Sequence, residues 1–428
     1  MKHPDDPDPA LYHEAFVALY PLYEMARLRH IAIEDPATRR SELNRLTHLR
    51  QLLDHRARNV TTPNNDTLYS SARLDLRLGP LLVEMPRIER RYYSLQFMNM
   101  YTDNIAILGR RQDGDGPLRV AVVGPGWQGA LPVHTQRVES DTDDMWLLVR
   151  TVVDGPGDVE AVAVLQERMH IAAPQPASAY PVQRVRPTKD PSPEVFLAVI
   201  REMLQRNPPR GEMLRRTTAA AELGVGASAP DWADLPAEVR AGWTAAWPAL
   251  QAALRDPATL RARTVAGWEF PPPEIGQWGD NLMLRASNAL RGIAALDLTE
   301  TLYLSTMVDI AGQPLDGRER YLVRLPAAGL PVRGFWSLTL YEAMPDGRYF
   351  LADNPIARYS IGDRTAGLIR GADGSIELHL QPDPPVDIAN WLPTPRAPFR
   401  LTLRAYLPEA ALVQGQVALP RVERVAGT

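Results

Sequence analysis

Residues 74–78 read Leu-Asp-Leu-Arg-Leu, and residues 93–97 read Tyr-Ser-Leu-Gln-Phe. Apolar side chains occupy every second position in both stretches, which is the period of a β-strand with one buried face. Short apolar runs follow at 105–108, 118–123 and 146–153, separated by segments that contain turn-forming residues. This pattern predicts an antiparallel β-rich module rather than a doubly wound parallel sheet.

The segments that flank this module have the spacing of helices instead. Apolar side chains recur mostly three or four residues apart over 10–29, and Asp8-Pro9 is a typical helix start. We therefore predict one helix over 10–29 and a second over 38–55. After the β-rich module, further helices are expected at 159–171, 193–205, 236–255 and 281–296.

The last third of the chain returns to short apolar runs divided by turns. They lie at 302–310, 319–325, 335–341, 375–380 and 399–406. This density of short strands predicts a second β-sandwich. The fold class that follows is α+β, with two β-rich, sandwich-like modules and a helical segment between them.

We therefore expect four regions along the chain. Residues 1–56 form N-terminal helices, residues 57–158 the first β-rich module, residues 159–297 a helical middle region and residues 298–428 the second β-sandwich module. A chain of 428 residues also exceeds the size at which a single core usually stops growing, so more than one domain is expected on length alone.

Composition narrows the classes of function. A net charge of −4 provides no basic surface for nucleic acid or for an anionic membrane, so neither partner is expected. The chain has no cysteine, which excludes disulfides, thiolate metal sites and a cysteine nucleophile. No apolar stretch approaches the ~20 residues of a membrane span, and we expect the chain as given to be cytoplasmic. A leader removed beforehand would leave no trace in the sequence.

Several common catalytic motifs are missing. The chain contains neither the P-loop pattern GxxxxGK[ST] nor the serine-hydrolase pattern GxSxG, and its eight histidines include no HExxH pair. Residues 124–129, Gly-Pro-Gly-Trp-Gln-Gly, have the glycine spacing of a dinucleotide-binding motif, but no helical pattern follows them. We interpret them as a turn between strands.

Polar side chains gather instead at two places in the first β-rich module. Residues 64–69 read Asn-Asn-Asp-Thr-Leu-Tyr just before a predicted strand, and Gln96, Tyr101, Asp103 and Asn104 lie in and after another. Buried polar groups are costly unless they are paired. These side chains therefore either form an internal network or face a ligand.

The second β module has a similar concentration. Residues 336–341, Trp-Ser-Leu-Thr-Leu-Tyr, include alternate positions of one strand, where side chains project onto a common face. Arg358 and Arg364 follow, and they have two interpretations. They can grip an anionic group of a ligand, or they can pair with Asp353 and Asp363.

These polar stretches carry a family resemblance. Residues 63–70, Pro-Asn-Asn-Asp-Thr-Leu-Tyr-Ser, with 74–76 after them, resemble the N-terminal module of the DUF1254 family. Residues 335–341, 354–365 and 404–406 resemble its usual companion, the DUF1214 family. The resemblance implies two β-sandwich modules, one DUF1254-like and one DUF1214-like, packed with a helical segment between them. It implies no activity, since both names denote unknown function.

The polar clusters predict an enzyme of hydrolase or lyase type that acts on a small polar or carbohydrate-like molecule. A carboxylate would act as acid–base, and a tyrosine hydroxyl would assist it. The candidate catalytic residues are Asp66, Tyr69, Tyr101, Asp103 and Tyr341. The candidate ligand-binding residues are His48, Asn64, Asn65, Gln96, Asn104, Trp336, Asn354, Arg358, Tyr359 and Arg364.

Three alternatives stay open. A divalent cation, Mg²⁺ or Ca²⁺, held by Asp66, Asp103 and amide oxygens can assist the same chemistry, because hard oxygen ligands suit these ions. The protein can instead bind a sugar or another small ligand without turnover, on the aromatic faces of Trp336 and Trp391. The polar stretches can also be packing networks that lock strands to helices. The expected partner is a small molecule, and the sequence is compatible with a homo-oligomer.

Overall fold

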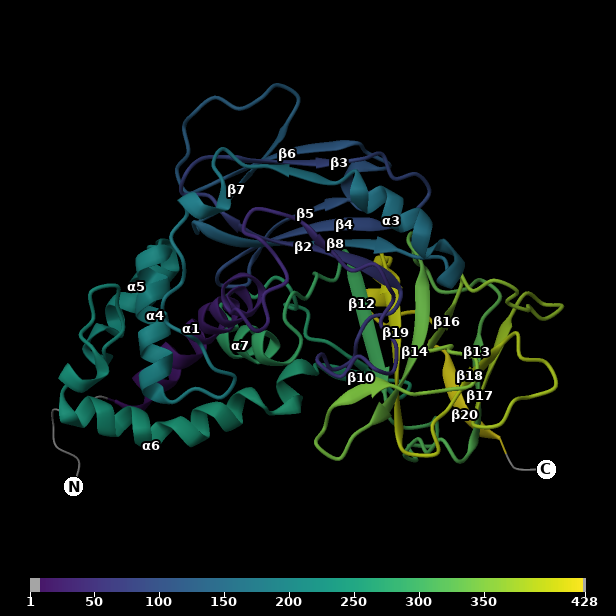
Figure 1. Ribbon diagram of the computed structural model, residues 1–428. Helices are drawn as coiled ribbons and strands as arrows, with labels where there is room; N and C mark the ends of the chain where they lie inside the picture. The colour runs from purple at the N-terminus through teal and green to yellow at the C-terminus, as the bar shows by residue number, and fades with distance from the viewer. Residues whose placement is uncertain (1–7, 426–428) are drawn as a thin grey trace.

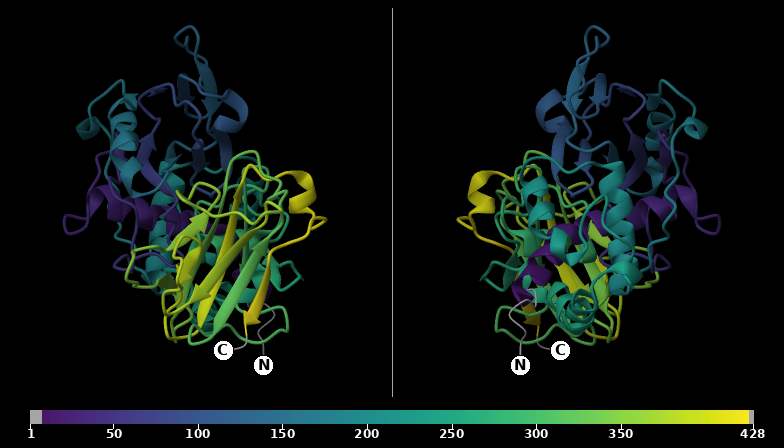
Figure 2. Two further views of the ribbon diagram at one scale, coloured as in Figure 1. Left: turned by 90° about the vertical axis from the view of Figure 1, so that its right-hand side faces the viewer. Right: turned by 90° about the vertical axis from the view of Figure 1, so that its left-hand side faces the viewer.

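The computed structural model describes residues 8–425 and confirms the predicted α+β class, with 26% helix and 27% strand. Four sheets form an N-terminal and a C-terminal β module, and most of the helices pack together beside them (Figure 1). Figure 2 places the blue N-terminal module above the green and yellow C-terminal module, with the helical group in front in its right-hand view. Within residues 8–425, every helix is too short or too polar to cross a membrane.

The N-terminal module is a sandwich of two sheets. The first sheet contains, in spatial order, β1 (Thr47–His48), β2 (Thr67–Asp75), β8 (Asp144–Val152), β4 (Tyr93–Asn99) and β5 (Asn104–Gly109). The second contains β7 (Gln136–Glu139), β6 (Leu118–Val123), β3 (Leu81–Met85) and β9 (His170–Ala172). Alternate side chains of both sheets, among them Leu74, Phe97, Val83 and Val120, form the core between them. The strand predicted at 93–97 is confirmed, whereas only the first two residues of the stretch 74–78 belong to a strand, because β2 ends at Asp75 and a turn follows.

The C-terminal module is also built from two sheets. The larger contains β10 (Arg263–Val265), β11 (Trp268–Phe270), β12 (Thr301–Thr306), β19 (Phe399–Tyr406), β14 (Trp336–Ala343) and β15 (Tyr349–Leu351), and β16 (Ser360–Gly362) also pairs with β14. The smaller contains β18 (Trp391–Pro393), β17 (Ile376–Gln381), β13 (Arg320–Leu325) and β20 (Arg421–Val425). Leu302, Leu338, Leu403 and Leu378 lie in the core between the sheets. The hairpin of β10 and β11 differs from the helical character expected there, because it continues the sheet beyond β12.

The longer helices pack against one another around α1. The helices are α1 (Pro9–Arg29), α2 (Arg110–Asp113), α3 (Val159–Glu167), α4 (Pro193–Arg206), α5 (Gly211–Ala219), α6 (Ala237–Leu254), α7 (Leu282–Arg291) and α8 (Ala410–Val413). Phe16, Phe196, Trp243 and Trp247 contact one another with ring centroids 5.1–6.2 Å apart. Asp8 caps α1 as predicted, because its carboxylate accepts a hydrogen bond of 3.0 Å from the N–H two residues later.

The helix predicted over 38–55 is wrong. These residues form turns and β1, and their backbone N–H groups pair with the edge of β2. The N–H of Asn44 donates to the carbonyl of Arg73 at 2.8 Å, and the N–H of Leu49 donates to the carbonyl of Tyr69 at 2.8 Å. Pairing with β2 satisfies these backbone groups and overrides the local helical spacing.

A buried charge network joins α1 and α4 to the N-terminal module. Asp144 is 0% exposed, accepts two hydrogen bonds of 3.0 Å from Arg206, and lies 3.5 Å from Arg29 and from Arg77. Asp75 is also 0% exposed, lies 3.6 Å from Arg206 and forms an ion pair with Arg77. Burial alone would raise the pKa of Asp144, but the guanidinium groups of Arg29 and Arg206 outweigh it and lower the pKa to about 2.

We expect part of the acid sensitivity of the fold to come from Asp144. Its pKa of about 2 in the folded protein lies below the ordinary 3.8, so its stabilising contribution is complete above about pH 5 and is lost as the pH falls towards 2. Between about pH 6 and pH 3 it should account for about 1 kcal/mol of the fall in the free energy of unfolding. Urea unfolding of the wild type and of Asp144→Asn at both pH values measures this difference. An equal fall in the two proteins would contradict the assignment.

Candidate functional site

One face of the large C-terminal sheet is polar and points at the N-terminal module. Tyr303 of β12 pairs with Arg404 of β19, and Arg404 pairs with Ser337 of β14, so the three side chains lie in one row across the sheet. The residues next to them along these strands belong to the apolar core of the C-terminal module. The period of two therefore separates a packed face from a face that is free for polar contacts.

The segment 62–66 lies against this polar face and brings Asp66 into it. Ser337 Oγ donates to Asp66 Oδ2 at 2.7 Å, and Ser360 Oγ donates to Oδ1 at 3.4 Å. Arg404 Nη1 lies 4.0 Å from Oδ2. Burial raises the pKa of the Asp66 carboxyl, while Arg404 and the two serines act in the opposite direction. Asp66 is 8% exposed, so it is a buried carboxyl surrounded by hydroxyls and one cation.

Arg404 holds the segment against the sheet. It donates from Nη1 to Thr339 Oγ1 at 2.6 Å and from Nη2 to the carbonyl of Thr62 at 3.3 Å and to the Tyr341 hydroxyl. Tyr341 donates in turn to the carbonyl of Pro63 at 2.8 Å, and burial raises its pKa. The Tyr341 hydroxyl is thus used to position this segment, which makes it poorly suited to the predicted role of proton donor.

A chain of hydrogen bonds runs from Asn64 of this segment to Tyr303 of β12. Asn64 Nδ2 donates to the Tyr406 hydroxyl at 2.7 Å, and the Tyr406 and Tyr303 hydroxyls share a hydrogen bond of 3.1 Å. The ring of Tyr406 stacks on Phe335 at a centroid distance of 4.1 Å. Tyr406 is fully buried, whereas Tyr303 is 36% exposed. Tyr303 is therefore partly exposed as a residue, while its hydroxyl lies in buried surroundings.

The N-terminal module contributes Arg150 and Tyr69 from paired positions of β8 and β2. The Arg150 guanidinium lies over the Tyr69 ring, 5.6 Å from its centroid. It donates to Gln96 Oε1 at 2.7 Å and to the carbonyl of Ala294 at 2.9 Å. Tyr69 and Tyr303 are among its strongest electrostatic neighbours. We call the meeting place of Asp66, Tyr69, Arg150, Tyr303, Arg404 and Tyr406 the intermodule site.

Asp103 and Tyr101 do not belong to the intermodule site. Asp103 forms an ion pair with Arg285 and accepts from Asn99 Nδ2 at 3.0 Å, while Asn99 Oδ1 accepts from the N–H of Tyr101 at 2.9 Å. These contacts lock the turn after β4, and the buried Tyr101 hydroxyl has no partner within residues 8–425.

The two predicted acid–base carboxylates lie at opposite ends of one sheet. The start of β2, next to Asp66, pairs with Val152 of β8, whereas Asn99, close to Asp103, pairs with Met145. The two positions on β8 are seven residues apart, which is about 23 Å along a strand.

Asp66 and Asp103 cannot share a divalent cation at this separation, so the alternative in which both carboxylates hold one ion does not fit the structure. Arg404, 4.0 Å from Asp66, also makes that carboxylate unfavourable for a further cation. In the described part of the chain, no three His, Asp or Glu side chains lie close enough together to hold a metal ion.

Gln96 and Asn104 connect the first sheet to the segments that flank α7. Gln96 Nε2 donates to Asn104 Oδ1 at 2.6 Å, and both side chains donate to the carbonyl of Ala295 at 3.0 Å. Asn104 also donates to the carbonyl of Gly276 at 2.8 Å and borders a depression of about 410 Å³ that Arg111 also lines. Gln96 thus orients Arg150, and Asn104 supports Gln96.

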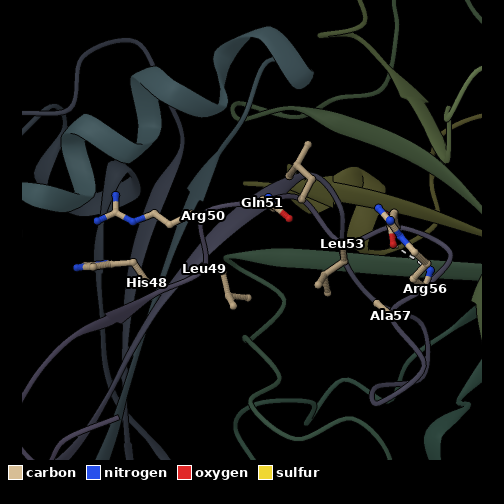
Figure 3. A pocket seen from close by; sticks show the side chains of 9 residues that line it. His48, Leu49, Arg50, Gln51, Leu53, Arg56 and Ala57 are labelled. Carbon is tan, nitrogen blue, oxygen red and sulfur yellow. Dashed lines mark hydrogen bonds and ion pairs between the residues drawn. The ribbon is translucent and has the colours of Figure 1, made fainter. Parts of the chain in front are cut away.

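His48 lies in a separate groove of about 510 Å³ that residues 48–54, 56 and 57 line (Figure 3). Its Nδ1 is 2.7 Å from Ser70 Oγ, and burial lowers its pKa to about 4, so the imidazole is neutral at neutral pH. Ser70 is four residues along β2 from Asp66, about 13 Å. His48 is therefore outside the intermodule site.

The two tryptophans differ from the prediction that their faces hold a ligand. Trp336 is 3% exposed and points to the apolar side of its sheet, opposite to Ser337. Trp391 is 1% exposed and donates from Nε1 to the carbonyl of Gln381 at 2.8 Å. Asn65 is half-buried next to Asp66, and its buried Oδ1 has no partner within the described residues.

Asn354 and Arg358 stabilise loops. Asn354 Oδ1 accepts from the N–H of Arg358 at 2.9 Å, and Arg358 Nη1 donates to the carbonyls of Ile388, Ala389 and Trp391 at 2.7–3.0 Å. Because Arg358 donates to these backbone carbonyls, it does not take the predicted role of binding an anionic group. It also does not pair with Asp353.

Tyr359 and Arg364 connect the modules away from Asp66. The Tyr359 hydroxyl lies 2.8 Å from His55 Nδ1 in the segment that leads out of the groove. Arg364 forms an ion pair with Asp154 of the N-terminal module, instead of the predicted pair with Asp363. Both are contacts between modules that sequence spacing does not reveal.

Arg150 and Tyr303 are site residues that the sequence interpretation misses. Both occupy alternate positions of predicted strands, 146–153 and 302–310, so a search for polar residues on otherwise apolar strands could have found them. Arg404 and Tyr406 lie in the stretch 404–406, which carries part of the family resemblance. The sequence interpretation assigned them no role in the site.

Two known protein families match parts of this chain. The DUF1254 family, described as proteins of unknown function, matches residues 43–173, and the DUF1214 family, described in the same way, matches residues 300–410. None of the curated proteins matches the chain.

Two solved structures are similar to this chain. The crystal structure of the VPA0106 protein from Vibrio parahaemolyticus has a TM-score of 0.75 at 23% identity, covering 98% of this chain and 100% of that one. An uncharacterised protein from Burkholderia cenocepacia has a TM-score of 0.46 at 17% identity, covering 99% of this chain and 91% of that one. On the two family matches, the chain belongs to the proteins that combine a DUF1254 domain, here at residues 43–173, with a DUF1214 domain, here at residues 300–410.

Proposed function

We propose that the protein is an enzyme of hydrolase or lyase type that acts on a small polar or carbohydrate-like molecule at the intermodule site. The observation that carries the proposal is the surroundings of Asp66. Its carboxyl is buried between two modules, accepts from Ser337 and Ser360, and has Arg404 at 4.0 Å. A carboxyl in such a setting is a candidate general acid or base, because environments that shift a pKa recur at catalytic sites.

The chemistry assigned to each residue follows from its contacts. Asp66 exchanges the proton, since burial moves the pKa of its carboxyl up from its ordinary value towards neutrality. Tyr69 is the partner hydroxyl, because its side chain is half-buried and no hydrogen bond of its hydroxyl occurs within residues 8–425. Arg404 and Tyr341 are positioning residues, since they hold the segment 62–66.

The site draws residues from both family domains. Asp66, Tyr69 and Arg150 lie within 43–173, and Tyr303 and Arg404 lie within 300–410. Neither domain alone supplies the full set, which supports a function that requires both modules.

Asp66→Asn is expected to lower the turnover of any accepted substrate by about 100-fold or more, because general acid–base catalysis contributes on the order of 10²–10⁴. The amide has almost the same shape but cannot exchange the proton. The measurement is a screen of the purified protein against chromogenic esters, glycosides and elimination substrates, followed by kcat and KM for each hit. Tyr69→Phe should lower kcat as well.

The matched control is Asp346→Asn, an exposed carboxylate that pairs with Arg348 in a turn. Its turnover should equal that of the wild type. If Asp66→Asn and Tyr69→Phe kept every activity while remaining folded, the assignment would be wrong. Tight retention of a ligand with no turnover of any substrate would favour the non-catalytic binding protein.

A further inference from the structure

Arg150 is a buried cation without an anionic partner. It is 5% exposed, and no carboxylate within residues 8–425 lies within ion-pair distance of it. Its strongest electrostatic neighbours are the tyrosines Tyr69, Tyr303, Tyr92 and Tyr406. An arginine side chain stays charged in proteins, and a buried charge without a counter-ion is costly.

Most other buried arginines of this protein have a carboxylate nearby; Arg73, which is 6% exposed and lies 3.9 Å from the centroid of the Trp146 ring, is another that forms no ion pair within residues 8–425. Arg206 and Arg285 form ion pairs with Asp144 and Asp103, and Arg404 lies 4.0 Å from Asp66. Arg150 is as buried as Arg206, Arg285 and Arg404, but it has no such carboxylate. Its positive charge is therefore uncompensated within residues 8–425.

The guanidinium also has unused hydrogen-bond donors. It has five N–H groups, and the hydrogen bonds to Gln96 and Ala294 each use one of them. Two tyrosines lie beside it. Tyr69 is half-buried, and Tyr303 is 36% exposed. A carboxylate that reached the guanidinium beside these rings would therefore meet a charged and oriented donor.

We propose that Arg150 binds the carboxylate of a small organic acid in the intermodule site. This assignment of a substrate class rests on the proposed function, because it concerns the same site. A monoanion fits best, since Arg150 contributes one uncompensated positive charge while Arg404 already faces Asp66. The aromatic rings of Tyr69 and Tyr303 favour an organic acid with an apolar or aromatic body over inorganic phosphate.

Equilibrium dialysis with benzoate, its neutral isostere benzamide and inorganic phosphate at constant ionic strength tests the proposal. Benzoate should bind the wild type more tightly than benzamide or phosphate. Arg150→Met should weaken benzoate binding by about 10- to 100-fold, because a charge-assisted hydrogen bond is lost, and should leave benzamide binding unchanged. Arg119→Met, an exposed arginine of the second sheet that pairs with Glu84, is the control and should bind benzoate like the wild type.

Each other outcome has a defined meaning. Equal binding of benzoate and benzamide by the wild type, or equal benzoate binding by Arg150→Met, overturns the proposal. Tighter binding of phosphate overturns the carboxylate assignment. If Arg150→Met does not fold, Arg150→Lys replaces it, and its benzoate affinity should fall because lysine lacks the planar fork.

The result is also separable from the proposed function. Benzoate binding at Arg150 without turnover of any substrate would leave this inference intact and remove the enzyme. Turnover that depends on Asp66, with no preference for benzoate, would support the enzyme and overturn this inference.

Discussion

Replacing Arg404 with alanine is expected to lower the free energy of unfolding by about 3–5 kcal/mol, the usual cost of removing one partner from a buried charged contact. The side chain is 2% exposed. Its loss leaves Asp66 without its cation and removes the donors to Thr339 and to the carbonyl of Thr62. The segment 62–66 would then have lost its main contacts with β19.

Urea unfolding at neutral pH measures this effect. Arg396→Ala is the matched control, since that arginine is 63% exposed and pairs only with the exposed Asp383. Its effect should stay within about 0.5 kcal/mol. A loss for Arg404→Ala no larger than that of the control would show that the segment 62–66 is held by other contacts.

Replacing Asp144 with alanine is also expected to lower the free energy of unfolding by about 3–5 kcal/mol. The carboxylate is 0% exposed and accepts from Arg206 twice and from Asn207 Nδ2 at 2.9 Å. Without Asp144, other carboxylates would balance the positive charges of the buried Arg206 and Arg29 only in part. The charge network between the helices and the first sheet would therefore weaken at its centre.

The control for Asp144→Ala is Asp383→Ala, because that carboxylate is 71% exposed and surface ion pairs contribute little. Circular dichroism during urea or thermal unfolding compares the variants. If Asp144→Ala unfolded at the same denaturant concentration as Asp383→Ala, the network would not be a source of stability.

The local alternation of apolar and polar residues predicted the fold well. Strands at 93–97 and 399–406 are read from a period of two, which depends only on neighbouring residues, whereas the alternating stretch 74–78 covers the end of β2 and the turn after it. The helix over 38–55 failed for the opposite reason, because pairing with β2 decides that segment: Asn44 and Leu49 pair with residues 29 and 20 positions further along the chain, at 73 and 69.

The candidate site was predicted in part. The position of Asp66 and the polar stretch 64–69 follow from the sequence, because polar residues beside an apolar strand need partners. Those partners are remote in the chain, since Ser337 and Arg404 lie in the other module. The separation of Asp66 from Asp103 depends on the pairing of β2 and β4 with β8, which no local pattern specifies.

The sequence by itself predicted the two β modules and the helical segment between them, and it indicated candidate site residues in both modules. The tertiary structure decided which side chains meet there, because a strand pattern assigns residues to faces but does not say which face of another sheet they contact. It joined Asp66, Ser337 and Arg404, and it left Arg150 buried beside Tyr69 with no ion pair to a carboxylate of residues 8–425. Contacts between distant segments carry this information, and they exist only once the modules have packed.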